Sequence, residues 1–224
     1  MIFAIYGNLP VPRYALLLAA TTAAILVSGC AKDGEIDATG GVSVTRSACP
    51  AVAVPRYTGD ITVFDPPSSR DARAIDVVAD LTNLRSTCAD SGEDVVSTAT
   101  FDVIGRRLKA TGARTVTLPY FATVVRSGRL VVSKRIGSVT LEFKDGEIRA
   151  AAKGTASANV NRAAATLPAE VRERITRKRR AGDTDAAIDP IADPEVRAAV
   201  GKASFELLIG FQLTSEQLQY NATR

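Results

Sequence analysis

Histidine and tryptophan are absent from all 224 residues of the sequence, and methionine occurs once. Without histidine, a Ser-His-Asp triad, a Cys-His dyad and a histidine-ligated zinc site are impossible. No serine stands three residues ahead of a lysine, which removes the Ser-x-x-Lys acylation motif. A glycine-rich phosphate loop and a dinucleotide-binding fingerprint are also lacking. These absences exclude most routine enzyme mechanisms, and we expect a non-catalytic protein without a cofactor or a metal.

Charge is missing from a long apolar stretch near the start of the chain, residues 14–30. Arg13 precedes this stretch and the small pair Ser28-Gly29 lies near its end, so it has the basic, apolar and small-residue regions of a secretory signal. We therefore expect residues 1–29 to be a signal peptide. The alternative is an uncleaved transmembrane helix, but an apolar run of about 17 residues is at the short end of what spans a bilayer.

The tetrad Val27-Ser28-Gly29-Cys30 resembles the lipobox of bacterial lipoproteins. The resemblance implies that Cys30 becomes the first residue of the mature chain and carries acyl groups on its sulfur and its amino group. Ala31 stands where an Asp retains lipoproteins in the inner membrane in enterobacteria-like sorting, so the resemblance implies an outer-membrane lipoprotein that faces the periplasm. Residues 1–12 are uncharged and fit a signal poorly, and we expect translation to begin at Val11.

The mature chain is mildly basic and has the size of a single domain. It contains 224 − 29 = 195 residues, which suffice for one hydrophobic core. Its side chains sum to 27 − 24 = +3, because Arg13 is the only charge removed with the signal. This balance does not argue for a nucleic-acid partner, which a cell-envelope location also disfavours. We expect residues 30–48 to be a lipidated flexible tether with a reach of roughly 20–25 Å, and residues 49–224 to be the folded domain.

Cysteine is scarce, with three residues in the whole chain. The lipoprotein resemblance assigns Cys30 to the lipid and leaves Cys49 and Cys88, an even pair in an oxidising compartment. A bond between them would close a loop of about 40 residues and stabilise the fold by roughly 4 kcal/mol in the chain-entropy model. The alternative is a pair of buried thiols.

Apolar residues after position 61 recur with a period of two, which predicts half-buried strands. The segments with this period are 75–81, 99–103, 116–124, 130–136, 139–143, 148–160 and 203–213. Strands of this number, with turns at short spacing, predict a mainly β protein, an antiparallel immunoglobulin-like β-sandwich. A short helical insertion is expected before the last strand.

Turn residues refine this prediction. Ser127-Gly128 predicts a hairpin, and Asp145-Gly146 predicts a second hairpin with a two-residue turn. Pro119 places its strand at a sheet edge or a bulge. Gly154 is expected to mark a bulge.

Three short helices are expected near the end of the chain. Thr166 is predicted to cap the first, with Pro168 in its first turn. Asp193 opens the second, which we expect to end at Gly201. Thr214, with a glutamine three residues later, resembles a capping box for the third.

A dense basic run lies in the first of these helices and just beyond it. It consists of Arg172, Arg174, Arg177, Lys178, Arg179 and Arg180. Such a run could face lipid phosphates, lipopolysaccharide or another anionic polymer, since each basic group near an anionic surface contributes about 1 kcal/mol. The alternative is a solvated helix, because Glu170–Arg174 and Glu173–Arg177 are spaced for i, i+4 pairs.

Carboxylates gather directly after the basic run. They are Asp183, Asp185, Asp189, Asp193 and Glu195. An EF-hand would need glycine and glutamate where Ile188 and Pro194 stand, so the simpler interpretation is an acidic loop that folds back on the basic helix. Asp145 and Glu147 have the residue types of a glycosidase pair, but charges beside a turn are ordinary.

The sequence as a whole predicts a lipid-anchored cell-envelope lipoprotein with a non-catalytic binding or assembly module. Its expected partners are the membrane, through Cys30, and an envelope protein or an anionic lipid or polysaccharide. The competing hypothesis is a carboxylate-dependent envelope enzyme that acts on glycan. Two or more acidic side chains in one deep cleft would favour the enzyme, and a shallow arginine-lined surface would favour binding.

Overall fold

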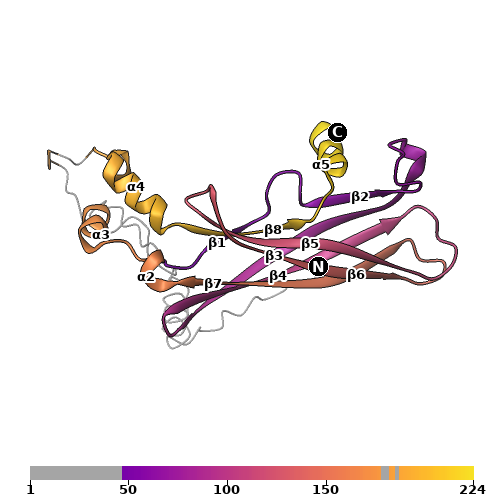
Figure 1. Ribbon diagram of the computed structural model, residues 1–224, viewed down its shortest axis with the longest axis horizontal. Helices are drawn as coiled ribbons and strands as arrows, with labels where there is room; N and C mark the ends of the chain where they lie inside the picture. Colours follow the sequence, from indigo (N-terminus) through magenta and orange to yellow (C-terminus); the bar gives the residue numbers. More distant parts are fainter. Residues whose placement is uncertain (1–46, 178–181, 185–186) are drawn as a thin grey trace, which may run out of the picture. The chain divides into compact units, whose positions relative to one another are not determined.

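The described residues form two β-sheets with a group of short helices (Figure 1). A computed structural model describes residues 47–177, 182–184 and 187–224, all of which belong to one compact unit. The sheets have the strand orders β1-β8-β5-β6 and β2-β3-β4-β7. The strands are β1 Ala51–Ala53, β2 Asp60–Phe64, β3 Ile75–Ser91, β4 Asp94–Arg107, β5 Arg114–Arg126, β6 Leu130–Phe143, β7 Arg149–Asn161 and β8 Phe205–Phe211.

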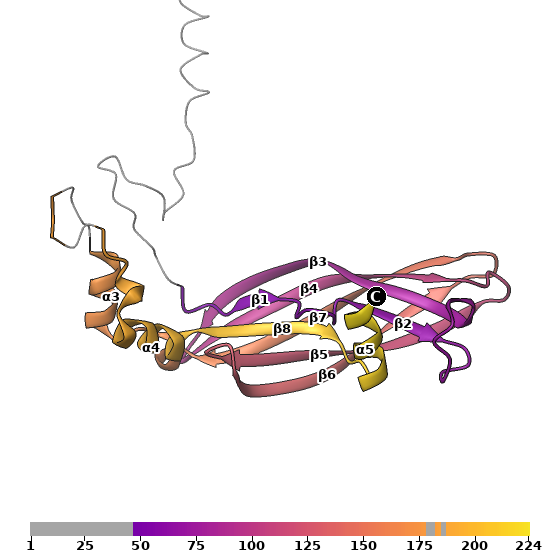
Figure 2. The same ribbon diagram turned by 90° about the horizontal axis from the view of Figure 1, so that it is seen from above.

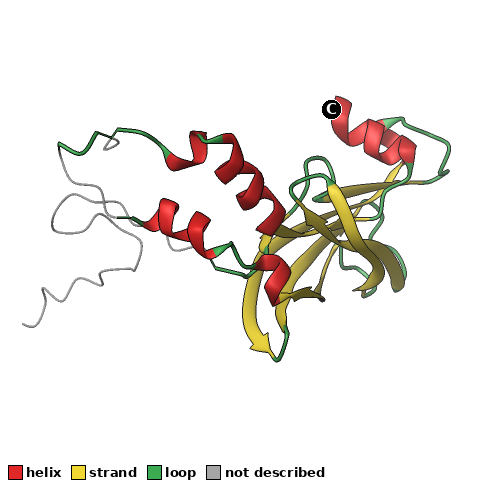
Figure 3. Cartoon of the chain, turned by 60° about the vertical axis from the view of Figure 1, so that its left-hand side comes forward, coloured by secondary structure: helices red, strands yellow, loops and turns green. Residues whose placement is uncertain are grey.

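Most of the helical residues lie between β7 and β8, which confirms the predicted helical insertion before the last strand (Figure 3). The helices are the 3-10 turn η2 Ala72–Ala74, α2 Arg162–Ala165, α3 Ala169–Thr176, the 3-10 turn η3 Pro190–Ala192, α4 Pro194–Ala203 and α5 Ser215–Thr223. Within the described ranges, none of these helices has the length and apolar character needed to cross a membrane.

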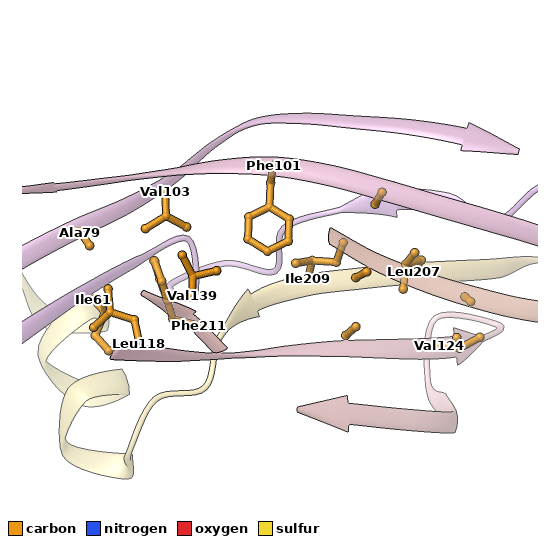
Figure 4. Close-up of a cluster of buried hydrophobic side chains, with 14 of the residues drawn as sticks. Ile61, Ala79, Phe101, Val103, Leu118, Val124, Val139, Leu207, Ile209 and Phe211 are labelled. Atoms are coloured by element: carbon orange, nitrogen blue, oxygen red, sulfur yellow. The ribbon is translucent and has the colours of Figure 1, made fainter. Parts of the chain in front are cut away.

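One hydrophobic core lies between the facing sides of the two sheets (Figure 4). The sheet that contains β4 contributes Ile61, Ala79, Phe101 and Val103, and the sheet that contains β5 contributes Leu118, Val124, Val139, Leu207, Ile209 and Phe211. The inward residues alternate with outward ones along β4 and β7, as the period of two predicts. Burial of this shared apolar surface is the main force that holds the sheets together.

Strand pairing is antiparallel except at one position. The three residues of β1 pair in parallel with β8, Ala51 opposite Glu206, whereas the sequence predicts antiparallel strands throughout. This strand is too short to show a period of two, so the sequence pattern did not predict it. Its partner β8 also pairs with β5 and therefore lies inside the sheet.

The hairpin predicted at Ser127-Gly128 is present and connects β5 to β6. Both turn residues have positive φ, 57° and 67°, as a turn of the I′ type requires. The hairpin predicted at Asp145-Gly146 is wrong, because β6 pairs with β5 and β7 pairs with β4 in the other sheet. Residues 144–148 instead connect the two sheets through a turn in which the Glu147 N–H donates to the Lys144 carbonyl oxygen.

Gly154 does not form the predicted bulge, because β7 pairs with β4 without a register shift. Its role is close packing: a Cβ at this position would overlap the Phe101 ring. That ring meets the Tyr120 ring edge to face at 5.1 Å, and a Cβ at Gly137 would overlap the Tyr120 ring in turn. The Tyr120 hydroxyl donates to the Thr155 carbonyl oxygen at 2.7 Å, so Tyr120 joins β5 to both β4 and β7 across the sheets.

Pro119 lies in β5, where the neighbouring strand β8 has just ended. Its carbonyl oxygen accepts a hydrogen bond from the Gln212 N–H at 2.9 Å, so its ring nitrogen faces the same side, beyond the last β8 pair. A backbone donor is therefore not required at Pro119. The predicted edge strand or bulge is nevertheless wrong, because β5 pairs with both β8 and β6 and its register shifts only between Val124 and Val125.

Two of the three predicted helix starts are confirmed. Asp193 caps α4 by accepting from the Glu195 and Val196 N–H groups, and Thr214 forms a capping box with Gln217. Thr166 does not cap α3; its own N–H closes α2, and α3 begins after Pro168 without a side-chain cap. Helix α4 also continues past Gly201 to Ala203.

The predicted disulfide is present between Cys49 and Cys88, with the two Cα atoms 6.1 Å apart. Cys49 is followed by Pro50 and then by β1, and Cys88 lies in β3. Because β1 and β3 belong to different sheets, the bond ties the sheets together.

Candidate functional site

The predicted basic helix corresponds to α3, and the structure describes Arg172, Arg174 and Arg177 of the basic run. Lys178, Arg179 and Arg180 lie outside the described residues. Helix α3 packs through Ile175, which is buried against Val196 and Val200 of α4 in a small core separate from the main one.

Arg174 is engaged with the acidic segment that follows the basic run. Its Nη1 lies 3.4 Å from Oδ2 of Asp193, while Oδ1 of the same carboxylate caps α4. The ion pair is the contact expected from an acidic loop that folds back on α3. Both side chains are more than two-fifths exposed, so the pair itself stabilises by less than about 1 kcal/mol.

A cavity of about 580 Å³ lies between α3 and α4 and carries charges of both signs. It is lined by Glu170, Glu173, Arg174, Arg177, Ile188, Asp189, Pro190, Asp193 and Val196. Two of its four carboxylates are already used by the backbone, because Asp189 caps η3 and Asp193 caps α4. All four are exposed, which gives no low-dielectric setting for a general acid.

The carboxylates of the acidic loop do not converge on a metal-binding group in the part of the chain that the structure describes. Asp183, Asp189, Asp193 and Glu195 form no group of three or more metal-ligating side chains there, and Asp185 lies outside the described residues. Asp145 was considered with Glu147 as a glycosidase pair. It accepts a hydrogen bond from the Gly112 N–H at 2.6 Å and so fixes the loop that contains Gly112.

One pair of carboxylates does face each other across neighbouring strands. Asp60 of β2 stands directly opposite Asp80 of β3, and Arg224 at the end of α5 forms an ion pair with Asp60. Burial raises the pKa of Asp80, the charge of Asp60 raises it further, and Arg224 acts in the opposite direction. Neither carboxylate lines the α3–α4 cavity or the cavity described next.

A second cavity, of about 350 Å³, lies beside the disulfide. Its lining includes Ser47, both bonded cysteines, Asp90 and Arg162 of α2. Nη2 of Arg162 lies 3.2 Å from Oδ1 of Asp90 and donates to the Gly92 carbonyl oxygen. The backbone N–H of Arg162 donates to the Glu93 carbonyl oxygen. The described chain therefore begins next to α2 and next to the turn between β3 and β4.

Arg107 is the most deeply buried charged side chain of the described residues, with 2% of its surface exposed. Its guanidinium donates to four carbonyl oxygens, those of Ala110, Gly112, Lys144 and Glu147, at 2.6–2.8 Å. It also stacks over the Phe143 ring at 5.3 Å. This arginine is occupied by the two loops that connect the sheets, which is a structural role.

Sequence reasoning missed an exposed aliphatic surface on β6. Leu130, Val131, Val132 and Ile136 are each more than half exposed. A signal was present: residues 130–136 read LVVSKRI, in which three consecutive aliphatic residues cannot all face the core of a strand.

Comparison of the chain with models of protein families, with curated proteins and with solved structures finds no match.

Proposed function

We propose that this protein is a lipid-anchored cell-envelope lipoprotein whose β domain is a non-catalytic binding or assembly module. The observation that carries the proposal is the Cys49–Cys88 disulfide. Disulfides persist in oxidising compartments, and this one lies in a chain that carries a lipobox-like tetrad at Val27–Cys30. The signal peptide, the lipid at Cys30 and the outer-membrane location facing the periplasm all belong to this proposal.

The domain is assigned to the immunoglobulin-like sandwiches within the same proposal. Two four-stranded sheets with a shared core and a disulfide that ties them together support this assignment. Such domains bind partners with surfaces and loops at their ends and need no catalytic group.

Anionic-surface binding by the basic run of α3 remains a weaker part of the proposal. Arg174 is shared with Asp193, and the adjoining cavity holds more carboxylates than arginines. The described contacts therefore favour a charge-balanced helix over an arginine-lined surface.

The lipid anchor is tested by Cys30→Ser in the full chain, expressed in a diderm bacterium. We expect the wild-type protein to partition with the membrane fraction and to carry an acylated Cys30 at its mature amino terminus by mass spectrometry. The variant should lack the acyl mass and accumulate as an unprocessed or soluble form. Cys49→Ser serves as the control, since it also removes a thiol but should leave the acylated terminus intact. Equal membrane retention and an unchanged amino-terminal mass in Cys30→Ser would contradict the proposal.

A further inference from the structure

The turn between β5 and β6 and the exposed start of β6 form one projecting feature, residues 126–136, which we name the β5–β6 tip. Leu130, Val131 and Val132 are 61%, 58% and 54% exposed, and Ile136 is 57% exposed. These are four of the ten exposed large apolar side chains among the described residues, and they fall within seven positions. Exposed aliphatic residues gathered in this way mark an interaction surface.

Two features of the backbone hold these side chains outward. β6 is the edge strand of its sheet, so no further strand covers it. The pairing with β5 shifts between Val124 and Val125, which leaves Val132 as an extra residue in β6. A bulge of this kind bends the strand and redirects its side chains.

Charge on the tip has a single sign. Arg129, Lys134 and Arg135 are exposed beside the aliphatic group, and no Asp or Glu occurs in the sequence between Asp102 and Glu142. Lys134 lies 5.4 Å from the centre of the Phe121 ring, so its stem follows the sheet surface. The tip therefore combines apolar and basic groups, as the surface of a protein that lies on an anionic membrane does.

The tip lies at the end of the domain where the described chain begins (Figure 2). Ser127 is held by the end of α4, because its N–H donates to the Ser204 carbonyl oxygen at 3.0 Å and its hydroxyl to that of Gly201 at 2.7 Å. At the same end, Ser47 shares the disulfide cavity with Arg162 of α2. Cys30 precedes Ser47 by 17 positions and so lies within about 60 Å of it, even in a fully extended chain.

The other corner of this end is acidic. The turn between β3 and β4 carries Glu93 and Asp94, and Asp90 beside it pairs with Arg162. This turn belongs to the sheet opposite β6. The charge of the tip therefore complements an anionic surface, whereas the charge of this end of the domain as a whole does not.

We propose that the β5–β6 tip docks on an anionic phospholipid surface, with Leu130, Val131 and Val132 in the interface and Arg129, Lys134 and Arg135 on the lipid phosphates. The inference rests on the proposed function, because a lipid at Cys30 brings this end of the domain to the bilayer. It adds a second contact that fixes which face of the domain meets the lipid.

Tryptophan fluorescence tests the docked orientation, because the natural chain contains no tryptophan. The unlipidated chain of residues 31–224 with Leu130→Trp is mixed with vesicles of phosphatidylethanolamine and phosphatidylglycerol. We expect a blue shift of the emission and quenching by brominated lipid. Leu108→Trp is the matched control, since Leu108 is 53% exposed directly after β4 and should give neither signal. A shift at position 108 and none at position 130 would overturn the proposal.

Co-sedimentation with the same vesicles tests the charges. Lys134→Gln with Arg135→Gln should weaken binding about thirtyfold, from two basic groups at an anionic surface. Arg149→Gln with Lys153→Gln on β7 removes the same charge from exposed positions elsewhere and should weaken binding only slightly. Vesicles of phosphatidylcholine alone should not bind the protein.

A second pair of variants tests the contribution of the aliphatic side chains to vesicle binding. Leu130→Gln with Val131→Asn should weaken vesicle binding at least about tenfold. The control variant, Ile104→Gln on β4 with Leu108→Asn directly after it, should not. Two results would overturn the proposal. The first is no vesicle binding by the wild-type chain, which would leave the free edge of β6 as a site for a protein strand. The second is vesicle binding that Arg172→Gln with Arg174→Gln abolishes and that the tip variants leave intact. Since the chain used carries no lipid, these results are independent of the test on Cys30.

Discussion

Arg107 shows how a single side chain organises the end of the domain where the chain passes between the sheets. The residue occupies an inward position of β4, in line with Phe101 and Val103, but its guanidinium reaches carbonyl oxygens of residues 108–113 and 144–148. The side-chain hydrogen bonds of Arg107 go to carbonyl oxygens, so backbone dipoles and the Phe143 ring balance the buried charge. The inward position follows from the period of two, whereas the carbonyl oxygens can be identified only from the folded loops.

We expect Arg107→Met to lower the free energy of unfolding by about 3 kcal/mol. The substitution keeps an apolar stem but leaves the four carbonyl oxygens without their shared donor. Urea denaturation followed by circular dichroism measures the change. Arg106→Met is the control, because Arg106 is exposed and its loss should change the free energy by less than about 0.5 kcal/mol. Equal midpoints for the two variants would show that the buried bonds contribute little.

At the scale of the element, β6 and β7 illustrate the limit of turn signals. Asp145-Gly146 has the composition of a tight hairpin, and Gly146 does adopt a positive φ of 79°. The two strands nevertheless do not pair, since β6 is the edge strand beside β5 in one sheet and β7 is the edge strand beside β4 in the other. Local sequence specifies that the chain turns, but it cannot specify which strand the chain pairs with afterwards.

Glycine has opposite roles in β7 and in α4, and substitution separates them. Gly154→Ala should destabilise the domain by about 1–3 kcal/mol, because the new methyl group overlaps the Phe101 ring and strains the contact with Tyr120. Gly201→Ala should instead stabilise it by up to about 1 kcal/mol, since the position is helical and its nearest neighbour, the Ser127 hydroxyl, is 3.8 Å away. Thermal melts of both variants give the comparison. A stable Gly154→Ala variant would mean that the aromatic pair can shift.

At the scale of the whole molecule, the disulfide is a covalent cross-link between the sheets, in addition to the loops that connect them. Reduction, or Cys49→Ala with Cys88→Ala, should lower the free energy of unfolding by up to about 4 kcal/mol, since the bond spans a sequence separation of 39 residues. Denaturation with and without reductant measures the difference, and the double variant should not respond to reductant. Peptide mapping of the native protein should yield one linked pair, and two freely alkylated thiols would refute the bond.

Part of the architecture was predictable from the sequence. The period of two located the long strands, and the even pair of cysteines located the disulfide. The short strand β1, its parallel pairing and the partition of strands between two sheets were not predictable, because they depend on contacts between residues far apart in the chain. For the candidate site, the sequence identified the basic run but not the ion pair of Arg174 or the exposed β5–β6 tip. Those features depend on packing and on the absence of a covering strand.

The position of β8 has a consequence for the order in which the domain is made. This strand is the last in the described chain, yet it lies between β1 and β5, the first strand and a middle one. The chain emerges from the ribosome or from an export channel with its amino terminus first, so β1 has no neighbour and β5 has an open edge until residues 205–211 have emerged. A chain halted before residue 205 would display two unfilled strand edges. The arrival of β8, and not the formation of the early hairpins, therefore sets the moment at which this sheet is complete.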